Sequence, residues 1–135
     1  SPEAADPVSV VRRFYAEQAR VYAGGPVEAI RELLADEVVW HVPGTSPIAG
    51  EHRGADAVLA YMDARRRLMD GNFRVEVHGV AMIAGRVVQL AGGRAVRGAE
   101  EVTWETVGVF RVAGGRIAEC WLLPFDQAAF DRIWS

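Results

Sequence analysis

Lysine is absent from this sequence of 135 residues, because all 15 basic residues are arginines. A lysine Schiff base and the lysine of a phosphate-binding P-loop are therefore excluded. The single cysteine, Cys120, excludes an internal disulfide and fits a reducing cytoplasm. No window approaches the roughly 18 consecutive apolar residues of a membrane-spanning helix, and no export signal is visible. We therefore expect a cytoplasmic protein without a membrane partner.

Charge and histidine spacing argue against two further kinds of partner. The net charge is −3, from 15 basic and 18 acidic residues, and no basic stripe with interleaved aromatic residues is present to bind nucleic acid. The one basic run, residues 65–67, falls late in a predicted helix, where we expect it to be solvent-exposed. His41, His52 and His78 are not closely paired, so no metal site is predicted. No cofactor is implied either.

Hydrophobic periodicity divides the chain into a helical first part and a strand-rich second part. Apolar residues at helical spacing predict helices over about 7–22, from Pro26 to about 34, over about 55–69, and over 125–134. Alternation predicts strands over 37–42, from 73, and over about 86–96, 100–112 and 116–123, with Gly92 and Gly93 interrupting one of them. A loop is expected over 43–53. This order predicts one α+β domain over residues 1–135, with helices on one face of an antiparallel sheet.

Three stretches carry a family resemblance: VVRRFYAEQ with PVEAIRELLADEVVWHVPG, SPIAGEHRGADAVLAYM, and VGVFRVAGGRIAECWLLPFDQAAFDRIW. They cover nearly the whole chain and resemble the SnoaL-like polyketide cyclase branch of the nuclear transport factor 2 superfamily. The resemblance implies a cone, in which three N-terminal helices pack on a strongly bent antiparallel sheet and a short C-terminal helix closes the chain. It also implies an apolar pocket at the wide end and a homodimer paired through the outer sheet face. Glycines are available for the bend: Gly79, Gly92, Gly93 and Gly108.

The resemblance assigns positions to proton-handling groups. In the steroid isomerase branch a general-base aspartate stands at the position of His41, and an oxyanion-binding tyrosine stands nearest to Phe14, with Tyr15 one residue away. Gly108 replaces the second acid of that branch and a histidine of the cyclases, and Leu122 replaces an aspartate of the cyclases. The chain therefore keeps the scaffold and lacks both proton-handling pairs, which leaves His41 as the candidate base.

The same positions predict the character of the pocket. If Gly108 faces inward, alternation along the strands turns Cys120 inward as well and turns Trp121 and Leu123 outward. The expected pocket is roomy, aromatic and apolar, and it suits a large neutral molecule held by shape. Its predicted lining is Trp40, Phe14, Trp104, Thr106, Gly108, Phe110, Cys120, Leu122 and Tyr61.

Three candidate catalytic residues each keep a structural alternative. His41 is either an acid or base near neutral pH or a histidine hydrogen-bonded at a strand end. Tyr15 either donates to a substrate oxygen or belongs to the core. Asp126 is first an N-cap of the last helix, and its acid could also reach the mouth of the cone.

We therefore expect a cofactor-independent enzyme of bacterial secondary metabolism, such as antibiotic biosynthesis. It would be a cyclase or isomerase for a large, hydrophobic, polyketide-like intermediate, with His41 moving a proton or orienting the substrate and Trp104 imposing the reactive shape. A pericyclic closure fits the missing acid-base pairs. Dehydration is an alternative reaction, and a non-catalytic small-molecule-binding or dimerisation module is an alternative function.

Overall fold

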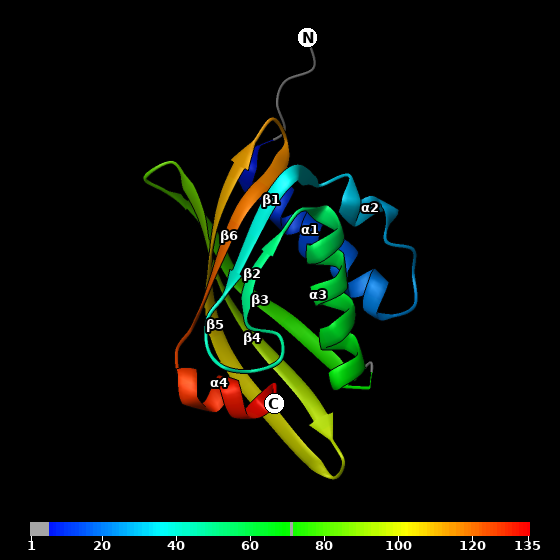
Figure 1. Ribbon diagram of the computed structural model, residues 1–135. Helices are drawn as coiled ribbons and strands as arrows, with labels where there is room; N and C mark the ends of the chain where they lie inside the picture. The colour runs from blue at the N-terminus through cyan, green and yellow to red at the C-terminus, as the bar shows by residue number, and fades with distance from the viewer. Residues whose placement is uncertain (1–5, 71) are drawn as a thin grey trace.

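The computed structural model describes residues 6–70 and 72–135 and shows an α+β fold built on one curved sheet (Figure 1). The α+β class expected from the sequence is confirmed. The described elements follow one another as α1 (Pro7–Tyr22), α2 (Glu28–Arg31), β1 (Leu34–Val42), β2 (Gly50–Arg53), α3 (Ala55–Leu68), β3 (Phe73–Ile83), β4 (Arg86–Arg97), β5 (Glu100–Ala113), β6 (Arg116–Pro124) and α4 (Gln127–Ile133).

The sheet is mixed rather than wholly antiparallel. Its strand order is β2-β1-β6-β5-β4-β3, and four of the five neighbouring pairs are antiparallel. The pair β1–β6 is parallel, with Trp40 opposite Cys120. Three hairpins link β3 to β6 and reverse the chain three times, so β6 runs opposite to β3, and β1 runs opposite to β3 as well.

The number of N-terminal helices is also corrected. Within the part of the chain that the structure describes, only α1 and the four-residue α2 precede the first strand, and α3 follows β2. The second predicted helix ends early because Leu34 already pairs with Ile117 of β6, so β1 begins there rather than at residue 37. The strand β2 lies in the predicted loop. Its four residues are mostly exposed and show no apolar alternation that would have revealed it.

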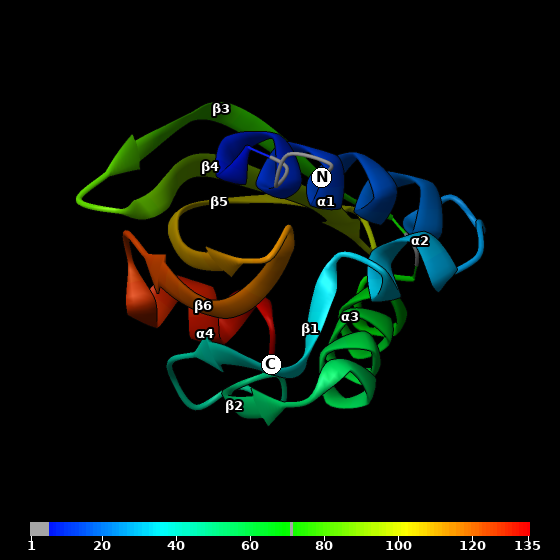
Figure 2. The same ribbon diagram turned by 90° about the horizontal axis from the view of Figure 1, so that it is seen from above.

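Bulges and helices shape the sheet into a cup, which Figure 2 shows from above. The β3–β4 register shifts between Val77 and Gly79, and the β5–β6 register shifts between Arg111 and Val112. An extra residue on one strand bends it and increases its twist. Gly92 and Gly93 do not interrupt a strand, because β4 runs on through both of them.

The helices α1 and α3 fill the concave side of the sheet (Figure 2). Asp6 caps α1 by accepting a hydrogen bond from the Ser9 amide at 3.2 Å. The buried stripe of α3 consists of Val58, Tyr61, Met62 and Arg65. The prediction that residues 65–67 are all solvated is therefore wrong at Arg65. Its spacing of i+3 from Met62 and i+4 from Tyr61 places it on the apolar face of the helix.

The C-terminal helix α4 closes one end of the cup (Figure 1). Phe130 and Trp134 are buried against the core. The loop after β1 is attached to the same helix, because the Thr45 amide donates to Asp131 Oδ1 at 3.2 Å. This attachment holds Trp134 at the base of α3, where it becomes part of the interior described below.

Candidate functional site

A small cavity lies inside the cup, between the inner sheet face and the helices. Five of the predicted pocket residues line it, together with the candidate catalytic residue Tyr15: Trp40, Tyr61, Trp104, Thr106 and Leu122. Arg65 and Phe130 contribute to the lining as well, although neither was predicted. The cavity measures about 20 Å³, which is room for about one water molecule.

The expectation of a roomy pocket is wrong because aromatic side chains fill the cup. A Cβ added at Gly108 would lie 2.9 Å from Cε1 of Phe110, so the Phe110 ring already occupies the space that the glycine leaves. Phe14 stacks toward Trp40, with ring centroids 5.2 Å apart, and Cys120 is fully buried. These four predicted pocket residues, Phe14, Gly108, Phe110 and Cys120, are therefore interior but do not line the cavity.

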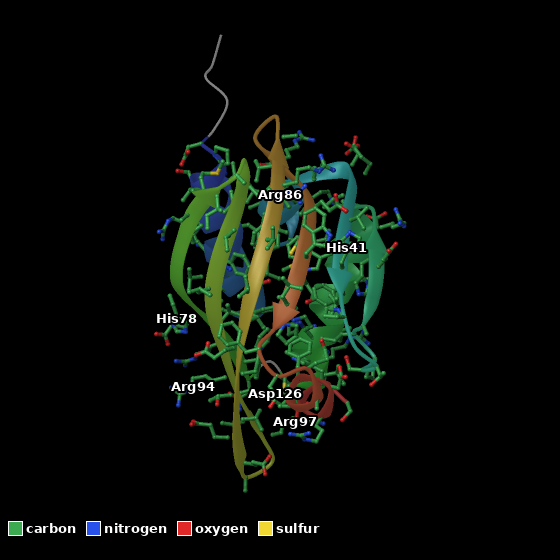
Figure 3. The ribbon with its side chains drawn as sticks, turned by 90° about the vertical axis from the view of Figure 1, so that its left-hand side faces the viewer. His41, His78, Arg86, Arg94, Arg97 and Asp126 are labelled. Carbon is green, nitrogen blue, oxygen red and sulfur yellow. The ribbon has the colours of Figure 1, made fainter. Side chains whose placement is uncertain are left out.

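His41 lies on the other side of the sheet (Figure 3). Trp40 points inward, so alternation turns His41 outward. Its Nε2 lies 2.6 Å from Oε2 of Glu119, and its ring stacks on Trp121 with centroids 5.5 Å apart. The hydrogen bond from His41 lowers the pKa of Glu119. The prediction that His41 sits in the pocket is wrong, whereas the alternative of a hydrogen-bonded histidine on the strand agrees with this geometry.

The other polar candidates also lie outside the cavity. Asp126 is exposed and caps α4, with its Oδ1 accepting from the Ala129 amide at 3.0 Å, as the structural alternative expected. His52 is half-buried, and its Nε2 donates to the Ile48 carbonyl at 2.8 Å. His78 is exposed and lies 3.2 Å from Glu105. These contacts account for each side chain without a ligand.

Arg65 is the residue that the sequence interpretation missed. Its relative exposure is 9%, and its guanidinium carbon lies 5.1 Å from the ring centre of Tyr61, 4.7 Å from Phe73 and 5.3 Å from Trp134. Among the described residues it forms no ion pair, and its buried Nε has no hydrogen-bond partner. Each ring contributes about 0.5–2 kcal/mol, whereas removing an ion from water costs several kcal/mol.

The titratable groups around the cavity are hydrogen-bond donors. Burial raises the pKa of Tyr61 to about 12 and raises the pKa of Tyr15 well above its usual value. Burial by itself would lower the pKa of Arg65, but the surrounding tyrosines raise it, so the guanidinium stays charged. The Tyr61 hydroxyl is buried and has no hydrogen-bond partner among the described residues.

A groove of about 410 Å³ lies beside the cavity, between α1 and β3. It shares Tyr15 and Val75 with the cavity lining. Tyr22 and Phe73 form another part of its wall, and their rings contact each other with centroids 4.8 Å apart. The groove therefore adjoins the interior, and it has the size of a small-molecule site.

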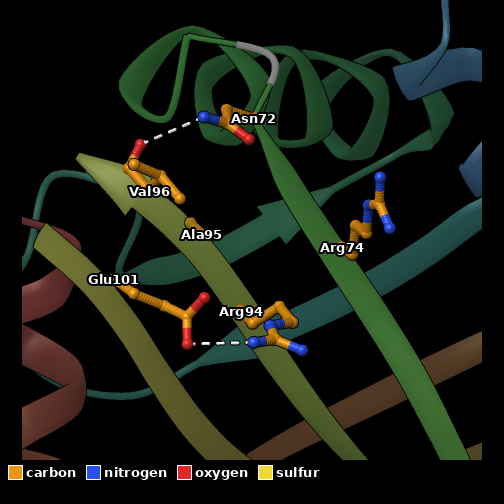
Figure 4. Close-up of a pocket in the computed structure, with 6 residues that line it drawn as sticks. All are labelled: Asn72, Arg74, Arg94, Ala95, Val96 and Glu101. Carbon is orange, nitrogen blue, oxygen red and sulfur yellow. Dashed lines mark hydrogen bonds and ion pairs between the residues drawn. The ribbon is translucent and has the colours of Figure 1, made fainter. Parts of the chain in front are cut away.

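Two further hollows lie along β3, β4 and β5. One of about 620 Å³ extends over Gly92 and Gly93 and includes His78 and Glu105. The other measures about 250 Å³, and Figure 4 shows that Arg94 pairs with Glu101 there, at 2.9 Å. The acidic and basic side chains in these hollows largely pair with one another, so few charged groups remain unpaired to bind a substrate.

Metal-binding clusters and membrane-spanning helices are absent from the described residues. No group of three or more His, Cys, Asp or Glu side chains there could hold a metal ion. No described helix has both the length and the apolar character needed to cross a bilayer.

The sequence profile of the SnoaL-like domain matches residues 11–120, and the chain therefore belongs to the SnoaL-like family. This confirms the resemblance inferred from the three sequence stretches. An uncharacterized protein of Mycobacterium tuberculosis is 30% identical over 129 residues, which cover 95% of both chains. That relative carries no assigned function.

Solved structures agree with this assignment. Bal32a, from a soil-derived mobile gene cassette, is 28% identical with a TM-score of 0.88, over 98% of this chain and 99% of that one. A protein of Jannaschia sp. CCS1, named as a candidate SnoaL-like polyketide cyclase, is 18% identical with a TM-score of 0.75, over 100% and 96% of the two chains. At this identity, the similarity to the Jannaschia protein shows a shared fold alone. The SnoaL-like fold generally binds small hydrophobic ligands.

Proposed function

We propose that this chain is a cofactor-independent enzyme that cyclises a small hydrophobic carbonyl compound held in the cavity and the α1–β3 groove. The observation that carries the proposal is the chemistry of the lining. Its titratable side chains, Tyr15, Tyr61 and Arg65, all remain protonated and act as donors. The Jannaschia protein that shares the fold is named as a candidate polyketide cyclase, which supports cyclisation as the reaction class.

Donors of this kind favour reactions in which negative charge develops on an oxygen. A hydrogen bond from Tyr61 or Tyr15 to a carbonyl stabilises that charge in a site that water does not fill. A pericyclic closure converts two π bonds into two σ bonds, transfers no proton and releases no atom. It therefore does not require the base that the described lining lacks. Isomerisation and dehydration both require a proton to be removed, and the geometry favours them less.

The substrate is smaller than the sequence suggested. A cavity of about 20 Å³ admits only one end of a ligand, and the groove of about 410 Å³ admits the remainder. A polyketide-like substrate must accordingly be a compact one, with its reacting part close to Tyr15, where the cavity and the groove meet.

A non-catalytic binding module is the second candidate. It is favoured by the outward position of His41, because the only predicted base lies across the sheet from the cavity. Such a module would hold a ligand without changing it.

Two model compounds distinguish these functions. The first is a triene bearing a conjugated ketone that closes slowly by an intramolecular cycloaddition, and the second is a β,γ-unsaturated ketone whose isomerisation needs a base. We expect the protein to accelerate the first reaction and not the second. Tyr61→Phe should reduce the acceleration about 100-fold, and His41→Ala should leave it unchanged.

Product formation followed by chromatography provides the measurement, and ligand-induced shifts of the Trp104 indole resonance report binding. Binding without acceleration of either compound would establish the module and reject the enzyme. Acceleration of the isomerisation, lost in His41→Ala, would overturn the proposed role of the cavity donors.

A further inference from the structure

We propose that Arg65 is an anion-binding residue and that the natural ligand of the cavity is an aromatic or polyene carboxylate. The guanidinium would hold the carboxylate at the inner end of the site, while the hydrocarbon part lies in the α1–β3 groove. This assignment rests on the proposed use of that cavity and groove for a small molecule, and it defines the class of the ligand.

The first argument is the missing partner. The next two residues of α3, Arg66 and Arg67, both pair with Asp63, at 2.8 and 3.0 Å. Arg65 lies on the opposite, buried side, and no described carboxylate lies within ion-pair distance of it. Helix α3 thus neutralises the arginines that face solvent and leaves the interior charge without a counter-ion.

The second argument is geometric. The rings of Tyr61, Phe73 and Trp134 lie 4.7–5.3 Å from the guanidinium carbon. Aromatic rings interact with a cation through their faces, and they supply no lone pairs in the plane of the fork for its five N–H donors. A carboxylate matches that planar fork with two parallel hydrogen bonds. The ring contacts therefore hold the Arg65 guanidinium in place without accepting hydrogen bonds from its N–H donors.

The third argument is the sign of the surrounding groups. The hydroxyls of Tyr22 and Tyr61 are buried without hydrogen-bond partners among the described residues. Both stay protonated, because burial raises the pKa of each of them. Two hydroxyl donors and one cation, with no opposing carboxylate, select a ligand that brings acceptors and negative charge. A neutral apolar ligand would leave all three groups unsatisfied.

Access completes the case. Tyr22 and Phe73 line the groove, and Phe73 also contacts the guanidinium of Arg65. A flat ligand lying against Phe73 and Val75 can therefore place its acid group beside Arg65. The aromatic walls of the groove and the cavity favour a flat, conjugated hydrocarbon part.

The test compares 2-naphthoate with 2-naphthamide, which have nearly the same shape and differ in charge. Isothermal titration calorimetry with the full chain should show at least tenfold tighter binding of naphthoate. Arg65→Met should remove this preference by weakening naphthoate at least tenfold, while naphthamide stays within twofold of its original affinity. Arg67→Met, on the solvent side of the same helix, is the matched control and should bind both compounds as the unmodified protein does.

Each other outcome has a defined meaning. Equal affinities for the two compounds in the unmodified protein overturn the anion site and leave the proposed small-molecule site standing. Binding of neither compound overturns the proposed site itself. If Arg65→Met does not fold, Arg65→Lys keeps the charge but lacks the planar fork, and it should retain part of the preference. A shift of the Arg65 Nε–H resonance with naphthoate, and not with naphthamide, is expected in the unmodified protein, and its absence argues against direct contact.

Discussion

The two faces of the sheet treat charge in opposite ways. On the outer face His41 pairs with Glu119 and Arg94 pairs with Glu101, so the protein supplies both members of each pair. On the inner side Arg65 faces aromatic rings and no described carboxylate. The comparison teaches that the outer charges are neutralised within the protein, whereas Arg65 gains a counter-ion only when a ligand binds.

The two glycines Gly93 and Gly79 show that packing also differs between the interior and the surface, because the interior position is crowded and the other is open. The indole of Trp104 lies directly over Gly93, where an added Cβ would come 2.0 Å from Cε2 of the ring. Trp104 is also held against Phe73 and Trp134, with centroids 5.9 and 5.2 Å away. At Gly79, on β3, an added Cβ would meet nothing within 4 Å.

This contrast gives the prediction with the largest effect. Gly93→Ala should lower the free energy of unfolding by about 3 kcal/mol, because Trp104 cannot move without disturbing two packed rings. Gly79→Ala is the matched control on the neighbouring strand and should change stability by less than about 0.5 kcal/mol. Urea denaturation followed by tryptophan fluorescence measures both. Equal losses in the two variants would show that the interior is no tighter than the surface.

Arg65 itself gives the second prediction, which has the opposite sign. Arg65→Met should raise the free energy of unfolding of the ligand-free protein by about 1 kcal/mol, because it removes an unpaired buried charge and keeps an apolar stem. A gain in stability together with lost naphthoate binding is the pattern expected of a functional residue. A loss of stability with ligand binding intact would instead assign Arg65 to the fold. Thermal denaturation without ligand supplies the measurement.

Much of this fold was predictable from the sequence. The helix α1 and the strands β4 to β6 lie within about two residues of the expected bounds, since their periodicity is long and regular. The strand β2 was missed because four exposed residues carry no alternation. The parallel pairing of β1 with β6 depends on contacts between distant segments, which local periodicity does not encode.

The site was predictable only in part. Alternation along β5 predicts that Trp104 and Thr106 face inward, and both line the cavity. The same rule, applied from Trp40, turns His41 outward. Arg65 was missed because a run of three arginines predicts a solvated face. The signal that identifies it is the helical spacing from Val58 through Tyr61 and Met62. That Phe110 fills the space at Gly108 depends on packing and leaves no mark in the sequence.

The outer face gives the smallest expected effect. A double-mutant cycle of His41→Ala and Glu119→Gln should show a coupling free energy of about 1 kcal/mol near neutral pH, because both side chains are only partly buried. The hydrogen bond from His41 lowers the pKa of Glu119, so the unfolded chain takes up a proton before the folded one as the pH falls. The coupling is therefore present above the ordinary glutamate pKa of about 4.3 and is lost as the pH falls through the lower folded-state value. Urea denaturation at a series of pH values measures this change. A coupling free energy that instead disappears as the pH rises from 5 to 8 would mean that the charge of His41 dominates the pair. A coupling free energy near zero at every pH would mean that stacking on Trp121, rather than the hydrogen bond to Glu119, holds the His41 ring.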